Sequence, residues 1–81
     1  PKGSVAWLVQ QERYDEAVRK AAKAAEKSPD DERAVREHRM ASVAWLLDRG
    51  RDAYLSGDTQ AALELFVEAE AIEPFEPAVL D

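Results

Sequence analysis

The side chain with the widest chemical range in this sequence is His38, the only histidine. On a helix, a metal site or an acid–base pair needs a second suitable side chain three or four residues away. The residues at those positions are Ala34, Val35, Ala41 and Ser42. None of them carries a carboxylate, so we expect a surface or interface histidine and neither a ligand nor a catalytic base.

Carboxylates also occur in pairs at helical spacing: Asp48/Asp52, Glu64/Glu68 and Glu70/Glu73. General acid–base catalysis needs burial to separate the pKa values of two such groups. We expect these pairs on solvated helix faces. The sequence also has no glycine-rich phosphate loop and no serine with a histidine nearby. It therefore predicts a protein that is not an enzyme and that uses no cofactor and no metal.

The cationic residues that can form one patch are Lys20, Lys23, Lys27, Arg33 and Arg36. Nucleic-acid readers add interleaved aromatic residues and a positive domain, whereas this chain has a net charge of −6. Residues 57–81 carry seven acidic side chains and no cation. We expect no nucleic-acid partner. The patch is either a solvated face or one half of a contact with an acidic partner, such as this acidic region of another copy.

The length of 81 residues allows one small domain with a limited core. There is no cysteine, and no apolar run approaches the roughly 18 to 20 residues of a membrane span. We therefore expect no membrane partner and a cytoplasmic location. The start Pro1-Lys2-Gly3 lacks both an initiator methionine and an apolar signal segment, which suggests a piece of a longer chain.

The elements that must position these residues are four helices, expected at 4–12, 15–27, 31–56 and 59–73. Apolar residues recur at helical spacing, and no alternating β pattern is present. Ser28 followed by Pro29 is a good start signal for the third helix, and Asp15 and Asp58 are candidate caps. Short turns make neighbouring helices antiparallel. The fold class is therefore all-α, with hairpins at about 4–27 and 29–73 and a tail at 74–81 in which Glu76-Pro77 can begin another helix.

The apolar faces of the expected helices differ in bulk. The second helix presents mainly alanine, and the fourth is expected to pack through Ala62, Leu63, Phe66, Val67 and Ala69. Gly50 lies inside the third helix, where it costs about 1 kcal/mol relative to alanine. A glycine at that position suggests that another backbone comes close.

A set of small, aromatic and helix-ending residues follows in the second hairpin: Gly50, Gly57, Ala62, Phe66, Ala69 and Pro74. Their spacing in "YLSGDTQAALELFVEAEAIEP" resembles the tetratricopeptide repeat, a helix–turn–helix unit of 34 residues. Residues 43–76 form one full repeat in that comparison. In the first hairpin, Ala17, Ala24 and Pro29 hold the corresponding places. Glu12 replaces the turn glycine and Ala21 replaces the aromatic residue, so the first turn can differ in geometry.

The two proline residues that mark the repeat ends, Pro29 and Pro74, are 45 residues apart. The 11 extra residues correspond to three helical turns with almost no phase drift. We therefore expect the third helix to be extended by about three turns, over Glu32–Ser42. The extension should project beyond the hairpin or lean on a neighbour.

The resemblance implies a concave groove, lined by the first helix of each hairpin, that binds a protein or an extended peptide. In this sequence the groove residues are Ala44, Leu47, Arg51, Tyr54 and Leu55. The alternative is that Leu47 and Tyr54 simply pack inside the fold. Some members of the family clamp a peptide carboxylate with Lys and Asn, but this chain has no Asn. The expected function is a protein-interaction scaffold.

The pentapeptide SVAWL occurs at Ser4–Leu8 and again at Ser42–Leu46. The copies are 38 residues apart and are out of register with the 45-residue spacing, by about two helical turns. We expect Trp7 to be exposed, or buried by something outside its own fold. The alternative function is self-association, in which two copies complete each other's core as a homodimer. The residues expected at that contact, or at a contact with upstream sequence, are Trp7, Val9, Val35 and His38.

Overall fold

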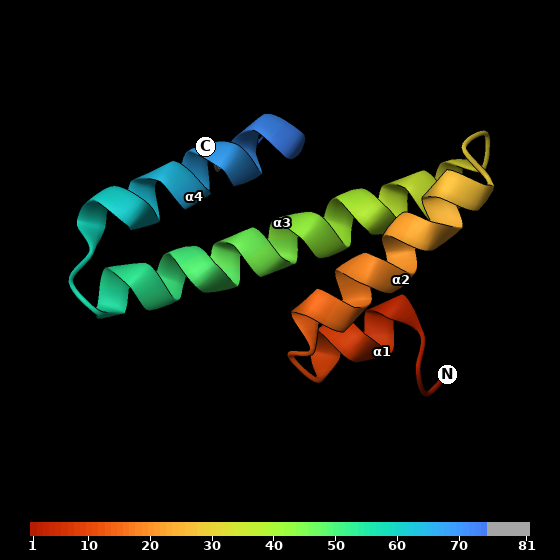
Figure 1. The fold of residues 1–81 in the computed structure, drawn as a ribbon, viewed down its shortest axis with the longest axis horizontal. Helices are drawn as coiled ribbons and strands as arrows, with labels where there is room; N and C mark the ends of the chain where they lie inside the picture. Colours follow the sequence, from red (N-terminus) through yellow and green to blue (C-terminus); the bar gives the residue numbers. More distant parts are fainter. Residues whose placement is uncertain (75–81) are drawn as a thin grey trace, which may run out of the picture.

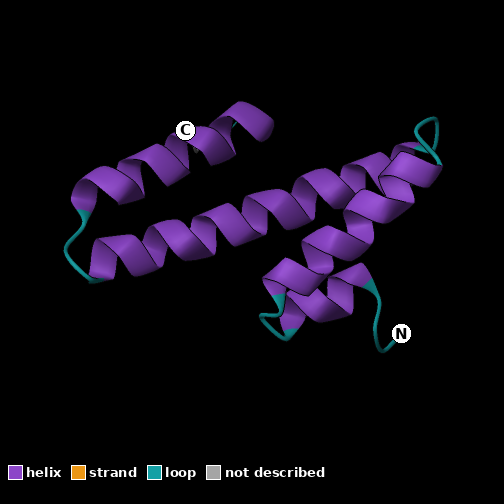
Figure 2. Ribbon diagram, viewed as in Figure 1, coloured by secondary structure: helices purple, strands orange, loops and turns teal. Residues whose placement is uncertain are grey.

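Four helices make up the regular structure in the computed structural model, which describes residues 1–74 (Figures 1 and 2). They are α1 (Val5–Gln10), α2 (Tyr14–Lys27), α3 (Glu32–Leu55) and α4 (Thr59–Ile72). No strand occurs in this part of the chain. The predicted fold class, all-α with helical hairpins, is confirmed. The predicted tail beyond Pro74, including the helix start at Glu76-Pro77, lies outside the described residues.

The 24-residue helix α3 is the spine of the molecule and is continuous from Glu32 to Leu55. It packs against all three other helices (Figure 1). The helices α2 and α4, both described in full, do not pack against each other. No Cα atom of one lies within 8 Å of a Cα atom of the other. The expected extension of the third helix is present, and on one side it leans on the first hairpin.

The first core joins the two helices of the N-terminal hairpin to the extension of α3. It consists of five buried side chains: Val5, Leu8, Ala17, Ala21 and Ala41. Trp7, Val9 and Val18 are partly buried and pack against this cluster. Because three of the five buried residues are alanine, the helices approach one another closely there.

The second core is the seam between α3 and α4. Its buried residues are Leu46, Gly50, Ala62 and Ala69. A Cβ atom at Gly50 would lie 2.6 Å from Cε1 of Phe66. The glycine therefore makes room for an aromatic ring of α4. We had expected a neighbouring backbone at this position, and the nearest atoms belong instead to the Phe66 side chain.

The ends of the helices differ in how their free N–H groups are satisfied. Ser4 caps α1 by accepting from the N–H of Trp7 at 3.1 Å, and Asp58 caps α4 by accepting from the N–H of Ala61 at 3.1 Å. The predicted cap of α3 at Ser28 was wrong, because Ser28 follows the last turn of α2. Asp31 caps α3 instead, and its carboxylate accepts from the N–H of Arg33 at 3.0 Å.

The helix α2 has no side-chain cap. It begins at Tyr14, one residue earlier than predicted, and the flanking residue Arg13 makes no capping hydrogen bond. Asp15, the predicted cap, instead lies within the first turn and accepts a hydrogen bond from Arg19 at 3.3 Å. Its carboxylate there still suits the positive end of the helix dipole.

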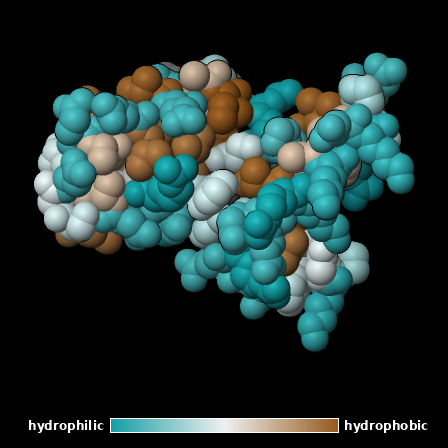
Figure 3. All heavy atoms as spheres, in the orientation of Figure 1, coloured by the Kyte–Doolittle hydropathy of each residue, from teal (hydrophilic) through white to brown (hydrophobic). Residues whose placement is uncertain are grey.

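The predicted packing face of α4 is only partly correct. Ala62 and Ala69 are buried, but Leu63 and Val67 are 58% and 59% exposed. On the face seen in Figure 3, apolar side chains gather along α4 and the neighbouring part of α3, whereas the α2 region is mainly hydrophilic. A helix with apolar residues around most of its circumference cannot bury all of them against one neighbour.

None of the helices within residues 1–74 combines the length and apolar character of a membrane span.

Candidate functional site

An apolar hollow of about 420 Å³ lies between α1 and α3, and we call it the groove. It is lined by Val5, Ala6, Val9 and Gln10 of α1 and by Glu37, Met40, Ala41 and Ala44 of α3. Six of these eight side chains are apolar. An apolar concavity with a few polar groups at its edge is the usual form of a binding site.

The groove exists because α1 is anchored against the first core. The Ser4 cap starts α1, and Val5 and Leu8 then point into the core and are 9% and 6% exposed. Val9 is half-buried and lies between the core and the groove. Met40, on the opposite wall, is 62% exposed, so its flexible thioether is available to a ligand.

The predicted groove residues continue from this site along α3. Ala44 lines the groove. Leu47, Arg51 and Tyr54 follow at spacings of three, four and three residues and share one face of the helix. Tyr54 and Leu55 are 63% and 74% exposed and Leu47 is 36% exposed, so Tyr54 is not packed inside the fold. The structure therefore places one of the five predicted residues in the groove and the other four beyond it.

The residues predicted for self-association lie in different places. Trp7 is half-buried, packs on its own core, and has the guanidinium of Arg13 at 5.6 Å from its ring centroid. We expected the Trp7 ring to be exposed or to be covered by another molecule. In the structure, part of the ring is covered by residues of the same chain. Val9 lines the groove. His38 is half-buried, and its backbone carbonyl accepts a hydrogen bond from the hydroxyl of Ser42 at 2.8 Å.

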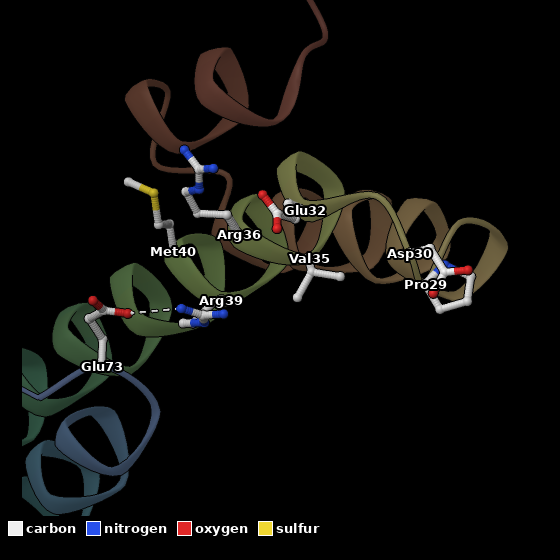
Figure 4. A pocket seen from close by; sticks show the side chains of 8 residues that line it. All are labelled: Pro29, Asp30, Glu32, Val35, Arg36, Arg39, Met40 and Glu73. Atoms are coloured by element: carbon white, nitrogen blue, oxygen red, sulfur yellow. Dashed lines mark ion pairs between the residues drawn. The ribbon is translucent and has the colours of Figure 1, made fainter.

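Val35, the fourth of those residues, belongs to a larger hollow of about 580 Å³ beside the N-terminal half of α3. Figure 4 shows Arg39 and Glu73 pointing toward each other across it, and their ion pair measures 3.6 Å. Arg36 and Met40 point to the other side of the helix in that view. The lining is mixed in charge and its side chains diverge, so this hollow has no convergent set of groups for one ligand.

The chemical candidates identified in the sequence do not come together in the described residues. Asp48 is paired with Arg51 at 2.8 Å, and Glu64 accepts a hydrogen bond from Gln60 at 3.4 Å. Within residues 1–74, no group of three His, Asp or Glu side chains is placed to hold a metal ion.

Sequence reasoning missed Val5, Ala6 and Met40 as groove residues. The available signal was the spacing of Met40, Ala44 and Leu47, which extends the predicted stripe upstream by one turn. It was missed because Glu32–Ser42 was interpreted only as an extension that projects beyond the hairpin or leans on a neighbour.

Comparison of the chain with family models, with curated proteins and with solved structures gave no match.

Proposed function

We propose that this chain is a protein-interaction module that binds an apolar segment of a partner in the groove between α1 and α3. The observation that carries the proposal is the apolar lining, contributed by two helices of different hairpins. An exposed apolar concavity on a small protein marks a contact surface, and a peptide helix laid into such a groove is a common mode of recognition.

The proposal includes a relation to the tetratricopeptide repeat. It is supported by the seating of the Phe66 ring on Gly50 and by turn hydrogen bonds that recur at a spacing of 45 residues. In such repeats, the first helices of successive hairpins line the binding surface, which corresponds to α1 and α3 here.

The test is selection of binders from a displayed library of random 15-residue peptides on the wild-type chain. The enriched peptides are then titrated against two variants. Met40→Glu places a charge in the groove, and Leu55→Glu makes a similar change at a well-exposed residue outside it. We expect Met40→Glu to weaken binding by about tenfold and Leu55→Glu by less than about twofold. Equal effects of the two variants, or no enriched peptide, would refute the proposal.

Self-association is the second candidate, favoured by the large apolar side chains that the single copy leaves exposed, among them Met40 and Leu55. Two hairpins are also fewer than the three or so repeats usually needed for stability. Sedimentation of the chain over a range of concentrations tests this candidate. A folded monomer down to low micromolar concentration would contradict it.

A further inference from the structure

A second apolar surface lies on the C-terminal hairpin, away from the groove. It consists of Leu47 and Tyr54 on α3 and of Leu63 and Val67 on α4, which are 36%, 63%, 58% and 59% exposed. None of the four lines the groove. We call these four residues the hairpin face.

The four side chains share one side of the hairpin because of its antiparallel geometry. Leu47 follows the buried residue Leu46, and Leu63 follows the buried residue Ala62. Each is therefore rotated by about 100° from the seam in the same sense. In an antiparallel pair, rotations of the same sense lead to the same side.

The four side chains also lie at neighbouring levels along the hairpin. The contact of Gly50 with Phe66 fixes the register of α3 against α4. Leu47, three residues before Gly50, is then level with Ala69, and Tyr54, four residues after it, is level with Ala62. Leu63 and Val67 fall between those levels, so the four residues form one surface.

The charge beside this surface has one sign on α4. That helix and the residue after it carry Glu64, Glu68, Glu70 and Glu73 and no cation. Arg39 forms an ion pair with Glu73. On α3, the nearest cation along the same stripe is Arg51, which is held by Asp48. The hairpin face is therefore apolar with an acidic border.

We propose that the hairpin face binds a basic amphipathic helix of another protein. The apolar face of the partner helix would cover Leu47, Tyr54, Leu63 and Val67, and its lysines or arginines would reach the glutamates of α4. This site is separate from the proposed groove. The 14 residues of α4 span about 21 Å, so a partner helix of about four turns matches its length.

A second copy of the chain is a poorer occupant on the same grounds. A symmetric contact between two α4 helices brings glutamates against glutamates, which disfavours the complex. The chain's own basic helix is α2, whose exposed residues include Lys20, Lys23, Ala24 and Lys27. That side offers charge but no large apolar side chain to cover the hairpin face.

The test uses three labelled synthetic peptides of 18 residues, and binding is followed by fluorescence anisotropy. The first is a leucine/lysine helix with its leucines on one side, and the second replaces every lysine with glutamate. The third has the first peptide's composition in scrambled order. We expect the first peptide to bind at least about tenfold more tightly than either of the others, and its affinity to fall with added salt. Equal binding of the first and third peptides would overturn the proposal, because it would show attraction by net charge alone.

Matched variants locate the site. Val67→Lys places a cation in the hairpin face, and Ala24→Lys adds the same side chain at an exposed position of α2. We expect about tenfold weaker binding for Val67→Lys and little change for Ala24→Lys or for the groove variant Met40→Glu. Equal weakening by Val67→Lys and Ala24→Lys would overturn the proposal. So would a dimer of the unliganded chain that Val67→Lys dissociates, because the occupant would then be a second copy.

Discussion

The two hairpins of this protein close their turns in the same way with different residues. In the second turn, Gly57 adopts a left-handed conformation with φ of 89°, and in the first turn Glu12 does so with φ of 59°. Three backbone hydrogen bonds in the first turn, from the N–H groups of residues 11, 12 and 13, recur 45 residues later. The comparison teaches that the same backbone turn forms with a glycine in one hairpin and a glutamate in the other.

The two hairpins also differ in the sizes of the side chains that pack between their helices. Gly50 lies against the large ring of Phe66 in the second hairpin. The residues 45 positions earlier are Val5 and Ala21, both buried in the first core. The second hairpin thus pairs a small residue on its first helix with a large one on its second, and the first hairpin has a large residue on its first helix and a small one on its second.

The largest loss of stability is expected from disrupting the contact between Gly50 and Phe66 in the second hairpin. Gly50→Val puts a Cβ atom 2.6 Å from Cε1 of Phe66 unless the ring moves. Overpacking of this kind costs about 1 to 3 kcal/mol, and we expect the upper end because the clash is short. Urea unfolding followed by the helical circular dichroism signal measures the loss.

The double variant Gly50→Val/Phe66→Ala reproduces the residue types of the first hairpin. It should be more stable than the sum of its single variants implies, by about 1 kcal/mol or more. If the two substitutions are strictly additive, the side chains at positions 50 and 66 are not energetically coupled, and the difference in size between the two hairpins does not affect stability.

The next effect comes from exchanging the turn residues. A left-handed residue other than glycine costs about 1 to 2 kcal/mol, so Glu12→Gly should raise the free energy of unfolding by about 1 kcal/mol. Gly57→Ala should lower it by a similar amount. Nothing lies within 4 Å of a Cβ atom at Gly57, so the cost of Gly57→Ala comes from the left-handed backbone conformation alone. Opposite shifts in midpoint temperature are expected, and shifts of the same sign would contradict the shared turn geometry.

The smallest losses of stability are expected from substitutions at the N-terminal ends of α2 and α4, the second helix of each hairpin. Asp58→Ala removes a capping hydrogen bond to the N–H of Ala61 and should cost about 1 kcal/mol. Arg13→Ala removes an exposed ion pair with Glu16 and the contact with Trp7, and should cost roughly 0.5 kcal/mol. Thermal unfolding of both variants compares the two costs, with Asp58→Asn as the control that keeps the cap. A larger loss for Arg13→Ala would show that the cap is not what distinguishes the hairpins.

Helical periodicity and breaker residues were enough to predict the fold. Asp58 caps α4 as expected, and the left-handed Gly57 lies just beyond the end of α3. A left-handed residue followed by a capping carboxylate is a local signal. The cap of α3 was predicted wrongly because Ser28, Asp30 and Asp31 all have capping side chains. Local sequence does not choose among them. In the structure Ser28 lies at the C-terminal end of α2, and Asp31 is the residue that caps α3.

The candidate surfaces were harder to predict because they depend on which faces meet. Ala62, Phe66, Leu63 and Val67 are all apolar, and periodicity alone assigned all four to packing. Among the described helices α4 packs on α3 alone, and this arrangement leaves Leu63 and Val67 exposed. The groove likewise depends on α1 lying against α3, a contact between residues far apart in the sequence.

The absence of contact between α2 and α4 has a consequence for folding cooperativity. The first core reaches α3 at Ala41 and the second core begins at Leu46, so about one helical turn of α3 connects them. Unfolding of that turn would uncouple the two hairpins energetically, as at a nearest-neighbour junction in a linear array. A partner that bridges the hairpins would therefore also act as the second link that makes them fold as one unit.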